Sequence, residues 1–288
     1  MAKTLGFAMI AIVAGWCALA AGGTELSTKP ATQPSTQPAK ELVFDLGNKV
    51  TMKLALIPAG KFTMGSPAGE KDRFKEEGPQ HEVTISKPFY MGVYTVTQAQ
   101  WQAVMGTTVS QQRDKVNKDL ELLGDGEDHP MCYVNWNEAA QFCTALSKKT
   151  GKTVRLPTEA QWEYACRAGS KTRFSYGDDD DYAKLGDYAW YVKNRDGKNH
   201  PVGQKKPNDW GLYDMYGNVW QWCADWFASY TNASTTDPAG PASGSWRVLR
   251  GCGSASDPRY CRSAYRSACP PVPADFTALG FRVIVELN

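Results

Sequence analysis

Three segments of this chain carry the residue pattern that begins an α-helix, and this pattern limits the possible folds more than any other feature. In each segment a Thr or Asn precedes a Gln or Glu by three residues, so the two side chains can satisfy free backbone N–H groups at the helix start. The pairs are Thr97 with Gln100, Asn135 with Glu138, and Thr158 with Gln161. Apolar residues follow at helical spacing, and the predicted helix ends are Gly106, Gly151 and Gly169. The sequence therefore predicts three separate helices.

Short runs rich in β-forming residues surround these helices. They are separated by Gly, Pro, Asn and Asp turns, and the clearest are LALIPAGKFTMG, HEVTISKPFYMGVYTV, SWRVLRG and GFRVIVEL. Ten tryptophans allow an irregular fold with few long elements to bury enough area. No fixed-period repeat, heptad or parallel βαβ alternation occurs, which argues against a solenoid, a coiled coil and a Rossmann fold. The prediction is an irregular α+β fold with low regular secondary structure.

Charge and catalytic motifs exclude several classes of function. The formal net charge is only +2, with basic and acidic residues interspersed, so the chain lacks the positive field that nucleic acid or an anionic membrane surface requires. The chain has no GxSxG elbow, HExxH helix or phosphate-binding loop. Its three histidines share no ligand spacing, so a histidine-based metal site is not expected.

The N-terminus has the order of regions found in secretory signal peptides. Lys3 precedes an apolar run from Leu5 to Leu19, and small residues end at Ala20. We therefore predict a signal peptide over residues 1–20, an exported protein in the periplasm or outside the cell, and no membrane span after cleavage. A retained membrane anchor, or lipidation at Cys17, is the alternative interpretation of the same segment.

A Pro- and Thr-rich segment follows the predicted signal peptide. Prolines recur every four residues at Pro30, Pro34 and Pro38, and the segment has too few large apolar residues to bury a core. We predict a disordered linker over residues 21–41 and a single folded domain over residues 42–288. Seven cysteines remain after the predicted cleavage, an odd number, so at least one has no disulfide partner within the chain.

Four segments of this domain resemble the formylglycine-generating enzyme (sulfatase-modifying factor) family. They are LIPAGKFTMGS (56–66), VNWNEAAQFC continuing to RLPTEAQWEYACRAG (134–169), GLYDMYGNVWQWCADW (211–226), and RVLRG continuing through YCRSAYR to LGFRV (247–283). Together they span nearly the whole domain. The resemblance implies a C-type-lectin-like fold that is irregular and often stabilised by calcium, which agrees with the α+β prediction.

The resemblance also implies a reaction: a cysteine in a sulfatase peptide is oxidised to formylglycine, with oxygen and a copper(I) ion held by two cysteine thiolates five positions apart. Counting from Arg250, the second cysteine is Cys261, but the first position is Ser256. A serine hydroxyl is a hard oxygen and a poor copper(I) ligand. The family's active-site serine position is Gly253. Cys252 replaces a family glycine, and could act as a substitute ligand or as the disulfide partner of Cys261.

Further family positions concern calcium and structural disulfides. The family's second calcium loop looks like Asp214, Gly217, Val219 and Gln221, where the expected terminal Glu is Gln221 and one charge is lost. Cys143 and Cys166 occupy family positions of structural cysteines, yet the partner positions are Val283 and Arg266. We therefore expect these two cysteines to be buried free thiols on the apolar sides of their helices.

Two functions remain open at this point. The first is an oxidoreductase of the formylglycine-generating type that acts on a sulfatase or another exported protein. The second is a non-catalytic binding module whose groove and exposed aromatic side chains bind a peptide, a glycan or a partner protein.

Overall fold

The computed structural model of this protein describes residues 39–273 and 277–287. The predicted signal peptide and residues 21–38 of the predicted linker lie outside the described residues. Within the described ranges, no helix is both long enough and apolar enough to cross a membrane.

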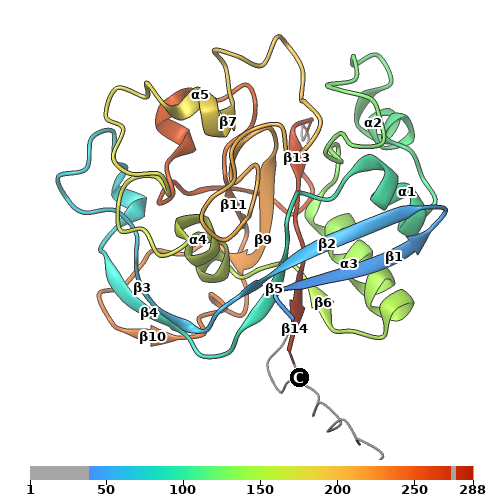
Figure 1. Ribbon diagram of the computed structural model, residues 1–288. Helices are drawn as coiled ribbons and strands as arrows, with labels where there is room; N and C mark the ends of the chain where they lie inside the picture. The colour runs from blue at the N-terminus through green and yellow to red at the C-terminus, as the bar shows by residue number, and fades with distance from the viewer. Residues whose placement is uncertain (1–38, 274–276, 288) are drawn as a thin grey trace, which may run out of the picture. The chain divides into compact units, whose positions relative to one another are not determined.

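The central element is a five-stranded sheet in which every neighbouring pair is antiparallel. Its strand order is β1 (Glu41–Gly47), β2 (Val50–Ile57), β5 (Phe89–Gly92), β14 (Ile284–Glu286) and β6 (Val154–Arg155). The last strand of the chain therefore lies inside the sheet, between β5 and β6 (Figure 1).

Smaller sheets adjoin this one. The first joins β10 (Thr235–Thr236), β4 (His81–Ile85) and β3 (Gly60–Met64), and the second joins β12 (Ser267–Cys269), β11 (Arg247–Arg250), β9 (Trp220–Trp226) and β13 (Leu279–Gly280). A further pair joins β7 (Ala189–Trp190) to β8 (Tyr216–Gly217). The strands are short, as the sequence predicted, and long irregular connections link them (Figure 1).

The helices begin where the capping pairs predicted. They are α1 (Gln98–Met105), α2 (Val109–Asn117), α3 (Trp136–Thr150), α4 (Glu159–Arg167) and the single turn α5 (Leu185–Tyr188). Both halves of each predicted capping box form in α1, α3 and α4. A fourth box, Thr108 with Gln111, opens α2, which the sequence prediction missed.

Two of the predicted helix ends are confirmed and one is displaced. Gly106 and Gly151 adopt the left-handed conformation that ends α1 and α3, with φ of 75° and 68°. At the end of α4 the left-handed residue is Ala168, with φ of 48°, and the predicted Gly169 is the next residue. The helix thus ends one residue earlier than predicted, and Gly169, with φ of 89°, is the second left-handed residue of the turn.

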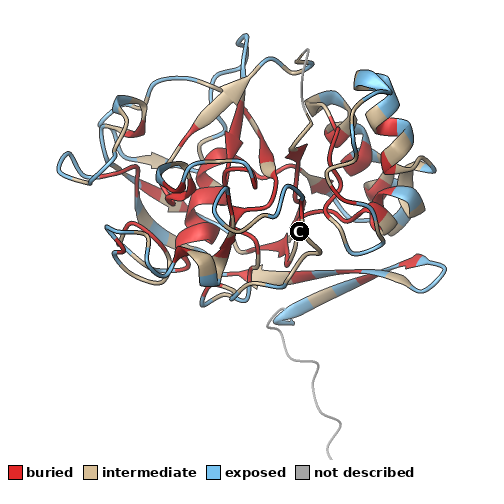
Figure 2. Cartoon of the chain, turned by 90° about the horizontal axis from the view of Figure 1, so that it is seen from above, coloured by how far each residue is buried: buried red, intermediate tan, exposed pale blue. Residues whose placement is uncertain are grey.

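Large aromatic side chains fill the core. On one side, Phe142 stacks on Trp101 at 5.7 Å between ring centres and meets Phe281 edge-on at 5.2 Å. On the other side, Trp162 and Phe174 are fully buried. Figure 2 shows buried residues concentrated along the inner strands and α4, while the β1–β2 turn is exposed. The irregular α+β fold predicted from the sequence is confirmed.

Helix α4 also carries charge into this core. Glu163, fully buried, pairs with Arg250 of β11 and with Arg167 one turn along the helix. Burial alone would raise the pKa of Glu163, but the charges of Arg167 and Arg250 outweigh it and lower this pKa. These pairs tie α4 to β11 and fix the start of the loop that follows β11.

Candidate functional site at the loop after β11

The loop after β11 holds Cys252, Ser256 and Cys261, the three residues of the predicted copper positions. The backbone leaves the strand through two left-handed residues, Gly251 with φ of 85° and Cys252 with φ of 58°. It then crosses residues 253–257 and enters a 3₁₀ turn, Pro258–Cys261. A Cβ at position 251 would lie 2.9 Å from the amide nitrogen of Gln221, so glycine is required there by both conformation and space.

Cys252 and Cys261 form a disulfide across this loop, with 5.3 Å between their Cα atoms. Both residues are fully buried. Cys252 is therefore the disulfide partner of Cys261 and not a substitute copper ligand. Cys261 therefore presents no thiolate in this state, and the disulfide closes the loop at its base.

Ser256 and Gly253 bond to each other within the loop. The hydroxyl of Ser256 accepts a hydrogen bond from the backbone N–H of Gly253 at 3.1 Å, and the N–H of Ser256 donates to the Gly253 carbonyl at 2.9 Å. A Cβ at position 253 would lie 2.9 Å from Cδ1 of Trp220. The indole ring thus occupies the space that a serine side chain would need.

These contacts decide whether the loop fits a copper(I) ion. Copper(I) prefers soft thiolate ligands. Here one candidate sulfur is in a disulfide, and the other position carries a hard hydroxyl that is already hydrogen-bonded. The donor set does not fit the ion that the family resemblance implied.

Half-buried aromatic side chains surround the loop. Tyr260 lies 5.0 Å from Tyr265 and 5.9 Å from Phe74 between ring centres, and Trp220 lies 6.1 Å from Tyr265. Beneath them the buried Arg262 donates to Glu70 and to Glu77, each at 2.7 Å. We call the side chains Phe74, Trp220, Tyr260 and Tyr265 the aromatic face. The guanidinium of Arg262, fixed by these ion pairs, lies 6.0 Å from the ring centre of Phe74.

Three of the four predicted calcium residues, Asp214, Gly217 and Gln221, hydrogen-bond to other protein groups, and the side chain of Val219 is buried in the core. The side-chain oxygen of Gln221 accepts hydrogen bonds from Trp162 Nε1 at 2.8 Å and from Arg282 Nε at 2.7 Å. Both partners can only donate, so the oxygen must face them and its two lone pairs are used. The amide nitrogen of Gln221 donates to the carbonyl of Asp214 at 2.9 Å. Gly217 N–H donates to the Gly251 carbonyl at 2.7 Å, which links this segment to the disulfide loop.

Asp214 is the remaining candidate ligand. Its Oδ2 accepts from Gly203 N–H at 2.8 Å, and its buried Oδ1 has no hydrogen-bond partner among the described residues. Burial raises the pKa of Asp214 to about 6. One free carboxylate oxygen beside the guanidinium of Arg282 does not fit a calcium ion, which needs six to eight oxygens. Within the described ranges, no group of three or more His, Cys, Asp or Glu residues could hold a metal.

The expected free thiols are confirmed. Cys143 and Cys166 are buried and unpaired, and burial raises the pKa of Cys166 to about 11, so its thiol stays protonated at neutral pH. At the position of its family partner, Arg266 instead makes two hydrogen bonds with Glu159, at 2.6 and 2.8 Å. An ion pair thus links α4 to the region after the disulfide loop without a second disulfide.

The chain is similar to known proteins in sequence and in fold. Residues 41–287 match the sequence pattern of the sulfatase-modifying factor enzyme 1-like domain. The formylglycine-generating enzyme of Mus musculus is 32% identical over 289 residues, which cover 81% of this chain and 75% of the mouse protein.

Two solved structures have the same fold. Treponema denticola variable protein 1 aligns with a TM-score of 0.73 at 31% identity, over 86% of this chain and 99% of that one. PvdO from Pseudomonas aeruginosa aligns with a TM-score of 0.73 at 31% identity, over 87% and 100%. This protein therefore has the α+β fold of formylglycine-generating enzymes. The chain belongs to the sulfatase-modifying factor family.

Proposed function

We propose that this protein is a non-oxidising member of its family that binds a peptide segment of a partner protein. One observation carries the proposal: the cysteine at the second copper position, Cys261, is in a buried disulfide with Cys252, while the first position is Ser256. The two thiolates that the family chemistry needs are both missing from this arrangement.

The other cysteines offer no replacement pair. Cys132, Cys143, Cys166 and Cys223 are buried free thiols, Cys269 is a half-buried free thiol, and burial raises the pKa of each well above neutral pH. Desolvation thus keeps them protonated, whereas metal binding and redox chemistry both require the thiolate.

The aromatic face supports binding at the same loop. Its tyrosine and tryptophan rings are half-buried and held in place by their ring contacts and by Arg262, so little side-chain entropy is lost on contact with a ligand. Such rings combine apolar area with a polar edge, which suits a peptide. The N-terminal residues support export, so we place both the protein and its partner in the periplasm or outside the cell. The partner class then includes sulfatases and other exported proteins, while a glycan is the competing ligand for the same rings.

The second candidate function is copper-dependent oxidation of a protein cysteine. Relatives named formylglycine-generating enzyme, about a third identical over most of the chain, favour it. In this chain it requires that the disulfide be reduced and that Cys252 serve as the first ligand.

The test is an anaerobic copper(I) titration, combined with mass spectrometry of a cysteine-containing sulfatase peptide incubated with the protein and oxygen. Wild-type protein is expected to bind no copper(I) tightly and to leave the peptide unchanged. The double variant Cys252→Gly with Ser256→Cys rebuilds the family pair and is expected to gain copper affinity. Cys252→Gly alone is the matched control, since it frees Cys261 without a second sulfur. Conversion of the peptide by wild-type protein would overturn the proposal.

The binding half of the proposal has its own measurement. The same peptide with Cys replaced by Ser, immobilised, is expected to retain wild-type protein but not the variant Tyr265→Ala. Retention of a sulfated or neutral oligosaccharide instead of the peptide would assign the aromatic face to glycans.

A further inference from the structure

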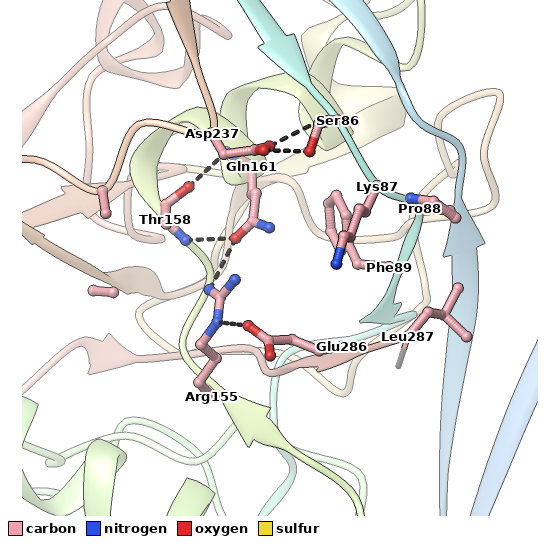
Figure 3. A pocket seen from close by; sticks show the side chains of 12 residues that line it. Ser86, Lys87, Pro88, Phe89, Arg155, Thr158, Gln161, Asp237, Glu286 and Leu287 are labelled. Carbon is pink, nitrogen blue, oxygen red and sulfur yellow. Dashed lines mark hydrogen bonds and ion pairs between the residues drawn. The ribbon is translucent and has the colours of Figure 1, made fainter.

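A cavity of about 490 Å³ lies between the β4–β5 connection, the start of α4 and the end of β14. Its lining includes Lys87, Phe89, Arg155, Gln161 and Glu286 (Figure 3). None of these residues belongs to the disulfide loop or the aromatic face. The volume is in the range of sites that hold small organic ligands.

Two donors in this cavity are fixed in direction. The side-chain oxygen of Gln161 accepts from Thr158 N–H at 3.0 Å and from Arg155 Nη1 at 2.9 Å. Its amide nitrogen must therefore point the opposite way, and Figure 3 shows it directed into the cavity. This nitrogen has no hydrogen-bond partner among residues 39–273 and 277–287.

Arg155 is held from the other side. Its Nε donates to Glu286 at 2.7 Å, and its Nη1 also donates to the Leu156 carbonyl at 3.0 Å. Both bonds orient the guanidinium and leave Nη2 without a partner in the described part of the chain. Because Arg155 and Gln161 are bonded to each other, their free nitrogens belong to one rigid unit.

The four charged side chains that line the cavity sum to zero, so their positions decide which ligand charge fits. The charge of Arg155 is balanced by Glu286, and Asp237 accepts two hydrogen bonds from Ser86. Lys87 makes no ion pair with any residue that the structure describes, and Figure 3 shows its amine pointing toward the same space as Gln161. Asp237 lines the cavity too, but its carboxylate is turned toward Ser86, whereas the amine of Lys87 and the amide nitrogen of Gln161 face the open space and together favour an anionic group there.

The walls supply an apolar surface next to these donors. Pro88, Phe89, Ala224, Ala239 and Leu287 line the cavity. A ligand that fills it therefore needs an acceptor-rich anionic end and an apolar body.

We propose that this cavity binds a small organic carboxylate with an apolar body, its two oxygens bonded by Gln161 Nε2 and Arg155 Nη2 and its charge balanced by Lys87. The fixed donors lose little freedom on binding, which is the reason for specificity toward a carboxylate. This site is additional to the proposed peptide-binding face and does not depend on it, because the two share no residue.

The test is isothermal titration of the full chain with N-acetylphenylalanine, compared with N-acetylphenylalanine amide, which has the same body but no charge. The carboxylate is expected to bind with one site per chain and at least tenfold more tightly than the amide. Gln161→Glu is the sharpest variant: a glutamate keeps the acceptor oxygen and the capping box but replaces the inward-facing donor with an anion.

Both Gln161→Glu and Lys87→Gln are expected to weaken carboxylate binding at least tenfold. Lys118→Gln, at an exposed lysine at the end of α2, is the matched control and is expected to leave binding unchanged. Equal binding of acid and amide, unchanged binding by Gln161→Glu in a protein with wild-type unfolding behaviour, or no heat of binding at millimolar ligand would overturn the proposal.

Discussion

The disulfide at the base of the loop can be tested by replacing Cys252 with glycine. Closing a loop between residues that are 9 apart lowers the entropy of the unfolded chain. At this separation the chain-entropy relation gives about 2.6 kcal/mol at 25 °C. Losing the bond removes this contribution.

The same substitution also relieves the backbone. Cys252 has φ of 58°, a left-handed conformation that costs a residue with a Cβ about 1 kcal/mol and glycine almost nothing. The net loss for Cys252→Gly is therefore about 1.5 kcal/mol in the free energy of unfolding. Cys261→Ala keeps the left-handed cysteine, so it is expected to lose about 1 kcal/mol more.

Urea unfolding of the three proteins measures these free energies, and a maleimide thiol count in denaturant identifies the bond. Cys252→Gly removes one cysteine but frees Cys261, so the variant should expose one thiol more than wild type. If the folded protein lacked the disulfide, the variant would expose one thiol fewer and would be at least as stable as wild type. A lower thiol count, or a variant as stable as wild type, would refute the disulfide and would make Cys261 available as a copper ligand again.

Three other substitutions test the surroundings of this loop. Arg266→Met should destabilise the protein by roughly 2–3 kcal/mol, less than for a fully unpaired buried charge, because Arg250 at 3.7 Å and the hydroxyl of Tyr230 at 3.2 Å still contact Glu159; adding Glu159→Gln should recover part of the loss in urea unfolding. Burial and the charge of Glu159 raise the pKa of Asp225 to about 7, above its unfolded value. The folded protein therefore favours the protonated carboxyl, and the resulting stabilisation is fully present below about pH 4 and is lost as the pH rises through 7. The difference in urea midpoint between wild type and Asp225→Asn should follow that curve, and a constant difference from pH 4 to 8 would contradict it. Gly253→Ser should cost about 1–3 kcal/mol because the new Cβ meets Trp220; an unchanged melting temperature and unchanged tryptophan fluorescence would show that the ring is free to move.

The helix starts could be predicted from sequence because each capping box is local. Thr158 and Gln161 satisfy each other within one turn, whatever the rest of the chain does. The α2 box at Thr108 follows the same rule and was available in the sequence, but few apolar residues follow it. The displaced end of α4 depended on a backbone choice between Ala168 and Gly169 that composition does not decide.

The site depended on contacts between distant segments, so less of it could be predicted. The sequence identified Cys252, Ser256 and Cys261 as unusual, but only the folded loop decides between a ligand pair and a disulfide. Gln221 was read as a weakened calcium ligand, whereas Arg282, 61 residues away, bonds its oxygen. No sequence motif marks the carboxylate cavity, because the residues that line it come from separate segments of the chain.

The position of β14 has a consequence for how this protein can be made. The strand that contains Ile284 and Glu286 is inserted between β5 and β6, so the five-stranded sheet cannot be completed until residues 284–286 are available. Until then one edge of β5 is open, and β6, which pairs only with β14 in the described sheet, has no partner. A variant that lacks residues 284–287 would therefore leave β6 without a partner and one edge of β5 open in the middle of the fold.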